Sequence, residues 1–263
     1  MTRPGTGVSL EAVVFDAGGT LVRLDFEWMA MAVTQLGFSL DAARLRRGEI
    51  EGRRRYDESR GGADAALPQP LGSVGDIRAY LGGMLAAAGV PPYMIGPVVV
   101  RLLARDRVNG LWSRPMEGAR EALDAVAGMG LRCAVISNSD GRAESILWSC
   151  DMLRGVEFVV DSQVVGIEKP DPGIFRIALE RLGVEPARAL FVGDIRSVDE
   201  AGARAARMPF VLIDPYRDYA APGAPAIAGL HELAGWIAAT FAAPGPVEEK
   251  VDASDHPAGV ARP

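Results

Sequence analysis

Short apolar runs that end at a carboxylate or a small polar residue recur along the chain. The first run, residues 11–15, ends at Asp16 and is followed by Gly18, Gly19 and Thr20, which is typical of a buried strand leading into a tight loop. The later runs cover residues 131–136, 158–160, 189–192 and 210–213, and they lead into Ser137, Asp161, Gly193-Asp194 and Asp214. The pattern predicts five strands of one sheet.

Apolar residues at helical spacing separate these strands. They recur three, four and seven positions apart in residues 119–126, 174–182 and 230–237. Asp171 and Pro172 suit the N-cap and first position of the second helix, and Pro115 suits the first turn of the first one. The alternation predicts an α/β fold, a doubly wound parallel sheet of Rossmann-like type with helices on both faces. Ligands of such sheets bind at the carboxyl ends of the strands.

One long segment interrupts the alternation. Between residues 25 and 112 the pattern is helical, as in residues 77–88, with a loop that starts at Gly61. Because this segment leaves directly after the first strand's loop, we predict an inserted helical cap of residues 25–112 above the carboxyl edge of the sheet. The remaining core domain is then residues 9–24 plus 113–241.

Two further segments have distinctive compositions. Residues 44–60 carry seven arginines against four acids, which we interpret as a solvated helix face rather than a site for an anion. Residues 242–263 contain four prolines and few large apolar side chains, so we expect a disordered tail there.

Composition narrows the class of partner. The chain has 263 residues, 49% of them hydrophobic, and a net charge of −6 without any long run of Lys or Arg. We therefore expect a small-molecule substrate and neither a nucleic-acid nor a membrane partner, whereas no feature indicates an oligomeric state. Cys133 and Cys150 lie in apolar surroundings without a disulfide framework, and no signal sequence or membrane-spanning run is recognisable. These features predict a cytoplasmic protein.

Carboxylates at the strand ends point to metal chemistry. Asp16 and Asp194 offer the oxygen ligands that Mg²⁺ prefers, and Asp199 follows five positions later. If the strands that carry them are neighbours, these groups converge, because adjacent strands lie about 4.8 Å apart.

Donors for an anion lie at the same predicted edge. Ser137, the N–H groups of the loop at residues 18–19 and Lys169 could bind the oxygens of a phosphoryl group. A metal, an anion site and a carboxylate oxygen together indicate phosphoryl transfer through an aspartyl-phosphate. A Ser-His-Asp site is excluded, since His231 lies on the polar side of a late helix and His256 in the tail.

Four segments, in this order, resemble the four motifs of the haloacid dehalogenase-like hydrolase superfamily, in the subfamily with a small helical cap. They are residues 13–21, reading Val-Val-Phe-Asp-Ala-Gly-Gly-Thr-Leu, residues 135–138, reading Val-Ile-Ser-Asn, residues 169–175, reading Lys-Pro-Asp-Pro-Gly-Ile-Phe, and residues 191–194, reading Phe-Val-Gly-Asp, with Asp199. The resemblance extends over residues 10–215.

The resemblance implies a Mg²⁺-dependent hydrolase, most simply a phosphatase of a small phosphorylated metabolite. Asp16 would be the nucleophile and a metal ligand, and the Gly18 carbonyl a second ligand. Asp194 and Asp199 would position the metal.

The resemblance also implies how the phosphoryl group is held. Ser137 and Lys169 would bind its oxygens as part of the catalytic machinery. The residues that would bind the substrate around them are Gly18, Gly19, Thr20 and Asn138.

One position departs from the pattern of the family's phosphatases. The second residue after their nucleophile is an aspartate that acts as general acid and base, and here it is Gly18. A positioned acid is worth about 100- to 10,000-fold in rate, so we expect weak activity on generic phosphomonoesters unless Asp25, Glu27 or a water replaces it. Two alternatives stay open: a catalytically impaired binding or regulatory relative, and a 2-haloacid dehalogenase, whose fourth motif differs from Gly193-Asp194.

Overall fold

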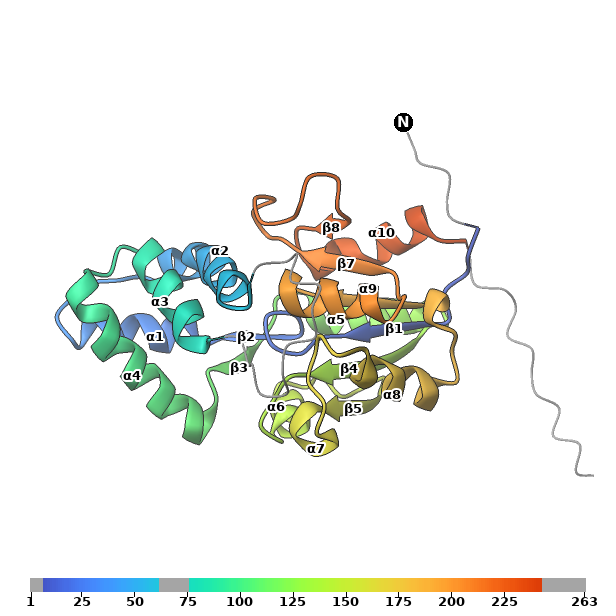
Figure 1. Cartoon of the computed structure of the whole chain (residues 1–263), viewed down its shortest axis with the longest axis horizontal. Coiled ribbons are helices and arrows are strands. Elements are labelled where there is room, and N and C mark those ends of the chain that lie inside the picture. Colours follow the sequence, from blue (N-terminus) through green and yellow to red (C-terminus); the bar gives the residue numbers. More distant parts are fainter. Residues whose placement is uncertain (1–6, 62–75, 243–263) are drawn as a thin grey trace, which may run out of the picture.

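The chain folds into an α/β core with a helical unit inserted into it (Figure 1). The structure, a computed structural model, describes residues 7–61 and 76–242. Six parallel strands form one sheet in the order β5-β4-β1-β6-β7-β8. They are β1 (Ala12–Phe15), β4 (Arg132–Ser137), β5 (Val156–Asp161), β6 (Ala189–Gly193), β7 (Phe210–Ile213) and β8 (Ala226–Ile227). The five predicted strands are present, and the two-residue β8 adds a sixth.

Helices cover both faces of the sheet because its strands are apolar on both sides. The core helices are α5 (Ala119–Gly128), α6 (Ala143–Ser149), α7 (Ser162–Val165), α8 (Pro172–Leu182), α9 (Ala201–Ala205) and α10 (Leu233–Thr240), with short helical turns at Pro186–Arg188, Arg196–Glu200 and Leu230–Glu232. In β1, Val13 and Phe15 share an apolar cluster with α5 and α10. Ala12 and Val14 belong to the opposite cluster with α8 and α9. The predicted doubly wound parallel sheet is confirmed.

The starts of two helices test the capping predictions. Asp171 is the N-cap of α8, and its carboxylate accepts a hydrogen bond from a backbone N–H of the first turn, as predicted. The prediction for Pro115 is wrong. This residue ends the strand β3 (Trp112–Pro115), and α5 begins only at Ala119. Proline also suits the end of an edge strand, where no N–H is needed, so its presence alone did not distinguish the two positions.

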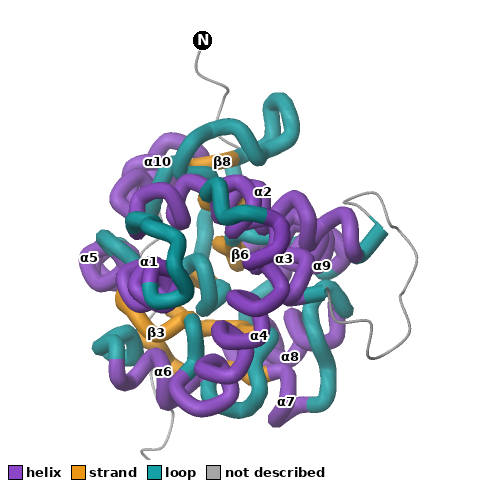
Figure 2. Tube along the Cα trace, turned by 90° about the vertical axis from the view of Figure 1, so that its left-hand side faces the viewer, coloured by secondary structure: helices purple, strands orange, loops and turns teal. Residues whose placement is uncertain are grey.

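The described residues 26–61 and 76–109 form the helical unit, which lies to one side of the sheet in Figure 1. Its helices are α1 (Phe26–Thr34), α2 (Ala42–Ser59), α3 (Ile77–Ala87) and α4 (Pro92–Asn109). They surround an apolar cluster of their own that includes Leu45, Leu81 and Leu102. In the end-on view of Figure 2 these helices lie in front of the carboxyl edge of the sheet.

Two short antiparallel strands, which the sequence pattern does not predict, connect the helical unit to the core. The strand β2 (Val22–Leu24) pairs with β3, so the chain leaves the core and returns to it side by side. Arg23 and Arg114 are partners in this pairing. With three or four residues each and an arginine in the middle, neither strand shows an apolar run.

The ends of the predicted segments are only partly described. Ala242, the first residue of the predicted tail, donates its N–H to the Val8 carbonyl at 3.1 Å and is therefore part of the fold. The rest of that tail and residues 62–75 lie outside the described residues. Within the described ranges, no helix combines the length and the apolar character needed to cross a membrane.

A glycine allows α2 and α3 to pack closely. A Cβ atom on Gly48 of α2 would lie 2.5 Å from the carbonyl oxygen of Met84 in α3, which is closer than real Cβ contacts. The close contact holds α2 against α3, and α2 is the helix that reaches into the core.

We expect Gly48→Ala to lower the free energy of unfolding by about 1–3 kcal/mol, because the added methyl group must displace the α3 backbone. The matched control is Gly96→Ala in α4, where a Cβ would have nothing within 4 Å. This control should raise the stability by about 0.5–1 kcal/mol, since alanine favours a helix more than glycine does. Urea unfolding followed by circular dichroism measures both variants, and equal effects would contradict the close packing.

Candidate active site

Neighbouring strands bring the predicted catalytic residues to one edge of the sheet. The strands β4, β1 and β6 lie side by side, and Ser137, Asp16 and Asp194 stand at or just after their carboxyl ends. All three line a cavity of about 360 Å³, together with Asn138 and Lys169. The structure thus brings together residues that are up to 178 positions apart in the sequence.

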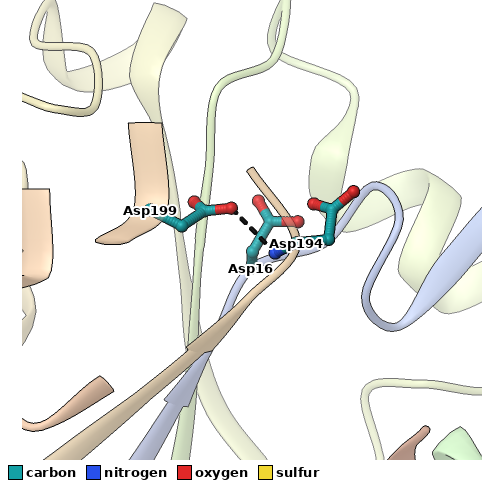
Figure 3. A group of neighbouring side chains, drawn as sticks. All are labelled: Asp16, Asp194 and Asp199. Carbon is teal, nitrogen blue, oxygen red and sulfur yellow. Dashed lines mark hydrogen bonds between the residues drawn. The ribbon is translucent and has the colours of Figure 1, made fainter. Parts of the chain in front are cut away.

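Three carboxylates converge at this edge, as Figure 3 shows for Asp16, Asp194 and Asp199. Lys169 lies between two of them. Its Nζ atom donates to Asp16 Oδ1 at 2.5 Å and to Asp199 Oδ1 at 2.7 Å. Asp199 Oδ2 accepts the backbone N–H groups of Asp194 at 3.0 Å and Ile195 at 2.9 Å. Both oxygens of Asp199 are therefore used to hold other site groups in position.

Asn138 fixes the loop that carries Lys169. The Asn138 side chain donates to the Lys169 carbonyl at 2.9 Å and accepts the Lys169 N–H at 2.8 Å. Asn138 does not cap the following helix, since α6 begins at Ala143 and its N-cap is Arg142. Two hydrogen bonds to another loop satisfy the amide better than a cap five residues away.

Burial and charge act against each other on the titratable groups. Burial raises the pKa of Asp16 to about 6, although Lys169 opposes the shift. Burial also raises the pKa of Asp194 well above its usual value, although the positive charge of Arg53 lowers it. For Lys169, burial alone would lower the pKa, but Asp16 and Asp199 outweigh it and the pKa is raised. Lys169 is therefore a permanent cation at neutral pH.

The donor set fits a divalent cation such as Mg²⁺. Oxygen atoms of Asp16, Asp194 and Asp199 lie within 4.8 Å of one another, and all three residues are buried. Lys169 and Arg53 are the cations paired with this cluster, and Arg53 also pairs with the buried Glu49 at 3.6 Å, so acidic groups outnumber cations there. Hard carboxylate oxygens with excess negative charge are what Mg²⁺ requires.

The helical unit contributes a buried arginine that the sequence analysis missed. Arg53 of α2 is only 1% exposed and pairs with Asp194 Oδ2 at 3.3 Å. It also donates to the Ile213 carbonyl at 2.9 Å. The interpretation of residues 44–60 as a solvated helix face is thus wrong for this position, because one side of α2 faces the core.

A second contact lies one helical turn further along α2. Asp57 accepts the hydroxyl of Tyr219 at 2.6 Å and the backbone N–H of Ser197 at 3.0 Å. Asp57 and Arg53 are four residues apart and therefore on the same helix face. The spacing of these two charged residues with Gly48 and Gly52 was the one signal that could have revealed a buried polar face.

Only two of the four residues predicted to bind the substrate line the cavity. Gly18 and Asn138 line the cavity, whereas Gly19 and Thr20 do not. The Gly19 N–H donates to the Val22 carbonyl at 2.7 Å, so it is used within the loop and cannot bind an anion there. A Cβ atom on Gly19, whose φ is +87°, would overlap the Asp194 carboxylate. The role of Gly19 is therefore to let Asp194 approach the loop.

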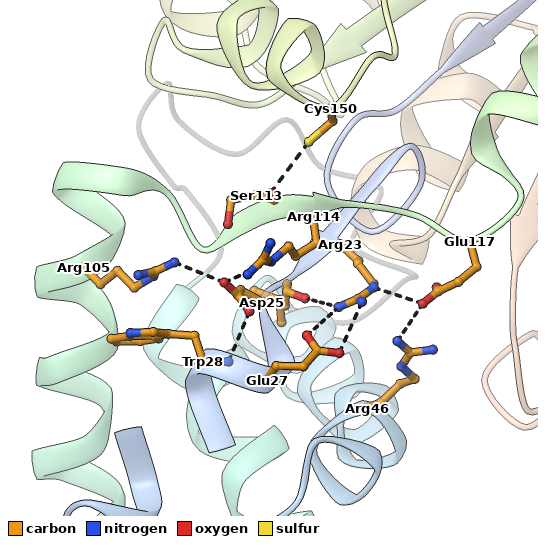
Figure 4. A network of polar contacts seen from close by, with 11 residues as sticks. Arg23, Asp25, Glu27, Trp28, Arg46, Arg105, Ser113, Arg114, Glu117 and Cys150 are labelled. Carbon is orange, nitrogen blue, oxygen red and sulfur yellow. Dashed lines mark hydrogen bonds and ion pairs between the residues drawn. The ribbon is translucent and has the colours of Figure 1, made fainter. Parts of the chain in front are cut away.

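The two carboxylates considered as replacement acids lie elsewhere (Figure 4). Asp25 is the N-cap of α1 and pairs with Arg105 and Arg114, each at 3.2 Å. Glu27 pairs with Arg23 at 3.2 Å. Neither carboxylate lines the cavity. Both stabilise the connection between the helical unit and the core instead.

Comparison with known proteins decides the family. Residues 10–207 match the family described as haloacid dehalogenase-like hydrolase. The chain belongs to this family of hydrolases.

Relatives of this hydrolase include named phosphatases. It is 31% identical over 216 residues to an N-acetylmuramic acid 6-phosphate phosphatase of Pseudomonas aeruginosa, a match that covers 78% of this chain and 84% of the relative. It is 40% identical over 126 residues to haloacid dehalogenase-like hydrolase domain-containing protein 3 of Mus musculus, and this match covers 48% of the chain but only 50% of the relative. Among solved structures, an L-2-haloacid dehalogenase superposes with a TM-score of 0.58 at 21% identity, covering 88% of this chain and 99% of that one, which shows the shared fold alone.

Removal of the Arg53 side chain should destabilise the folded protein. We expect Arg53→Met to lower the free energy of unfolding by about 3–5 kcal/mol, because it leaves the buried Asp194 carboxylate without its cation. The control is Arg55→Met on the exposed face of the same helix, where ion pairs with Glu51 and Glu58 contribute little. Chemical denaturation measures the free energy of unfolding of both variants. Similar losses of stability would show that the buried pair of Arg53 and Asp194 stabilises the protein no more than the exposed pairs do.

The raised pKa of Asp16 predicts a pH dependence of stability in the metal-free protein. Between pH 3.8 and about 6 the folded chain binds a proton at Asp16 that the unfolded chain does not. The Asp16 contribution to the free energy of unfolding should therefore fall by up to about 3 kcal/mol as the pH rises through this window. Denaturation of wild type and Asp16→Asn in EDTA between pH 4 and 7 tests this. Parallel pH profiles would contradict the raised pKa.

Proposed function

We propose that this hydrolase is a Mg²⁺-dependent phosphatase of a small phosphorylated metabolite that acts through an aspartyl-phosphate on Asp16. The observation that carries the proposal is the buried pair of Asp16 and Lys169 at the base of the cavity. Lys169 holds Asp16 Oδ1, while Asp16 Oδ2 has no hydrogen-bond partner among the described residues. A buried carboxylate oxygen without a partner is costly unless a ligand bonds to it.

The residues of the chain have distinct roles in this proposal. Asp16 Oδ2 attacks phosphorus, the bond from phosphorus to the ester oxygen breaks, and the leaving group departs with the electron pair. A water then hydrolyses the aspartyl-phosphate, which releases inorganic phosphate and regenerates Asp16. Lys169 and the hydroxyl of Ser137 hold the phosphoryl oxygens. Although burial raises the pKa of Asp16 to about 6, this value lies below neutral pH, so most of the nucleophile is ionised there.

Mg²⁺ bound by Asp16, the Gly18 carbonyl and Asp194 would supply positive charge against the phosphoryl oxygens. Asp199 already accepts hydrogen bonds from Lys169, Asp194 and Ile195, so it would act on the metal through a water. The helical unit would serve as the cap, residues 25–112, that closes the cavity from above and excludes water from the reaction.

The relatives support the substrate class. One is named for N-acetylmuramic acid 6-phosphate and another, 37% identical over 97 residues, is a phosphoglycolate phosphatase of Rhodospirillum rubrum. A cavity of about 360 Å³ has room for a molecule of this size class. A small phosphorylated metabolite and a cytoplasmic location remain predictions for this chain.

Removal of the nucleophile or the metal should abolish turnover. We expect Asp16→Asn to lower kcat for p-nitrophenyl phosphate by at least about 1,000-fold, because the covalent step has no substitute, and EDTA to have a similar effect. The control Asp124→Asn changes an exposed carboxylate on α5 and should leave kcat unchanged. Steady-state release of phosphate with Mg²⁺ and with EDTA is the measurement.

Two outcomes would contradict the proposal in different ways. Turnover that persists in Asp16→Asn would exclude Asp16 as the nucleophile. Binding of Mg²⁺ and orthovanadate without turnover of any phosphate ester would instead favour a catalytically impaired binding relative, to which Gly18 already points.

A further inference from the structure

The space next to Gly18 is filled by an aromatic ring. A Cβ atom on Gly18 would lie 3.2 Å from Cδ1 and 3.3 Å from Cγ of Trp112, the first residue of β3. Gly18 does not have a positive φ, so the backbone itself would accept a side chain. A side chain at position 18 would therefore begin in tight contact with the indole of Trp112, which would have to shift by a few tenths of an ångström.

Trp112 is part of a series of aromatic rings along the cavity. Its ring centroid lies 5.9 Å from that of Tyr80, which in turn lies 6.4 Å from that of Tyr56. All three residues line the cavity, with the apolar side chains of Ile77 and Ile146 beside them. The Tyr80 hydroxyl donates to Glu49 at 2.7 Å and is directed into the helical unit. This side of the cavity is thus mostly aromatic and apolar.

Few proton donors remain near the leaving group. Among the described residues that line the cavity, Asp140 binds Arg142 through both carboxylate oxygens. Asp106 accepts the Leu111 N–H at 2.8 Å and holds the end of α4. Glu168 precedes Lys169 in its loop. None of these carboxylates lies in the loop that carries the nucleophile.

We propose that Trp112 makes this site selective for aryl phosphates, esters of a planar aromatic hydroxyl whose oxygen leaves as an anion without being protonated. The proposal rests on the phosphatase function proposed above. When the phosphorus–oxygen bond breaks, the electron pair goes to the aryl oxygen, and solvent protonates it after release. A phenolic hydroxyl has a pKa of about 10, against about 16 for water, so its anion is a far better leaving group than an alkoxide.

Aromatic contact supplies the second half of the selectivity. A planar leaving group can pack against Trp112 and its neighbouring rings, whereas a polyol or sugar cannot gain this contact. Ring pairs of this kind are worth about 0.5–1.5 kcal/mol beyond area burial. Trp112 is in this sense a specificity residue that also crowds a side chain at position 18.

The first experiment compares leaving groups on the wild-type protein. The panel with Mg²⁺ contains phenyl phosphate and p-nitrophenyl phosphate as aryl esters, glycerol 3-phosphate as an alkyl ester, and acetyl phosphate as a non-aromatic compound with a good leaving group. We expect kcat/KM for phenyl phosphate to exceed that for glycerol 3-phosphate by at least about 100-fold, the factor that a missing acid implies. Equal values would overturn the inference while leaving the phosphatase function intact. Failure of every compound would instead contradict the proposed function itself.

The second experiment removes the ring. We expect Trp112→Leu to lower kcat/KM for phenyl phosphate about two- to tenfold more than for acetyl phosphate, because only the aryl ester loses ring contact. The control Trp148→Leu changes a tryptophan that is 75% exposed and should affect neither compound. An equal loss on both compounds would mean that Trp112 only maintains the fold.

The third experiment restores an acid. The double variant Gly18→Asp/Trp112→Leu should raise kcat/KM for glycerol 3-phosphate at least about tenfold over Trp112→Leu, because a carboxyl group now has both room and a proton to donate. Gly18→Asn/Trp112→Leu has the same shape without the proton and should show no gain. The single variant Gly18→Asp should gain less, since the indole is in the way.

Substitution of the remaining cavity donors completes the test. Asp106→Asn, Glu168→Gln and Tyr56→Phe should each leave the ratio of phenyl phosphate to glycerol 3-phosphate turnover within about threefold of wild type. A loss of at least about tenfold on glycerol 3-phosphate alone would identify that residue as the acid and overturn the inference. The wild-type panel and these single variants keep the proposal falsifiable even if a double variant does not fold.

Discussion

The site depends on one buried ammonium group. Lys169 is 2% exposed, and a cation at that depth costs several kcal/mol unless opposite charges surround it. Its two partners come from different places, Asp16 from the loop after β1 and Asp199 from the turn after β6, and Asn138 after β4 fixes its own backbone. The lysine is therefore compensated only when all these loops are in place. The same contacts that stabilise the carboxyl edge of the sheet also orient the Asp16 carboxylate, the proposed nucleophile.

A second buried cation extends this dependence to the helical unit. Arg53 brings its charge to Asp194 from α2, and Asp57 on the same face binds Tyr219 and Ser197 of the core. The docking of α2 is thus coupled to the charge balance of the cluster. Because three carboxylates face only two cations, a divalent metal bound there would change the charge that Arg53 meets. Cap position and metal binding are then expected to influence each other.

Much of the core could be predicted because its signals are local. A buried parallel strand is an apolar run, and Asp171-Pro172 is a helix start that needs no tertiary contact to be recognised. Asp16, Ser137 and Asp194 follow from the same logic, since the carboxyl ends of neighbouring strands must meet. The parts that could not be predicted depend on contacts between distant segments. β2 and β3 are too short for a pattern, and an arginine-rich stretch such as residues 44–60 has the same composition whether one side is buried or not.

Position 18 shows why a site residue cannot be evaluated from its own segment. In the sequence, Gly18 stands where the family's phosphatases carry an acidic residue. The sequence alone suggests that an aspartate placed there would act as the general acid. In the structure the same glycine packs tightly against Trp112, which is 94 positions away and belongs to the ribbon that connects the two parts of the chain. In the proposed reaction the core edge supplies the groups that bind the phosphoryl side, whereas the ribbon and the helical unit supply the rings on the leaving-group side. Under this proposal selectivity can change through Trp112, Tyr80 and Tyr56 without any change to Asp16 and Lys169, because the two sets of residues would contact different parts of the substrate.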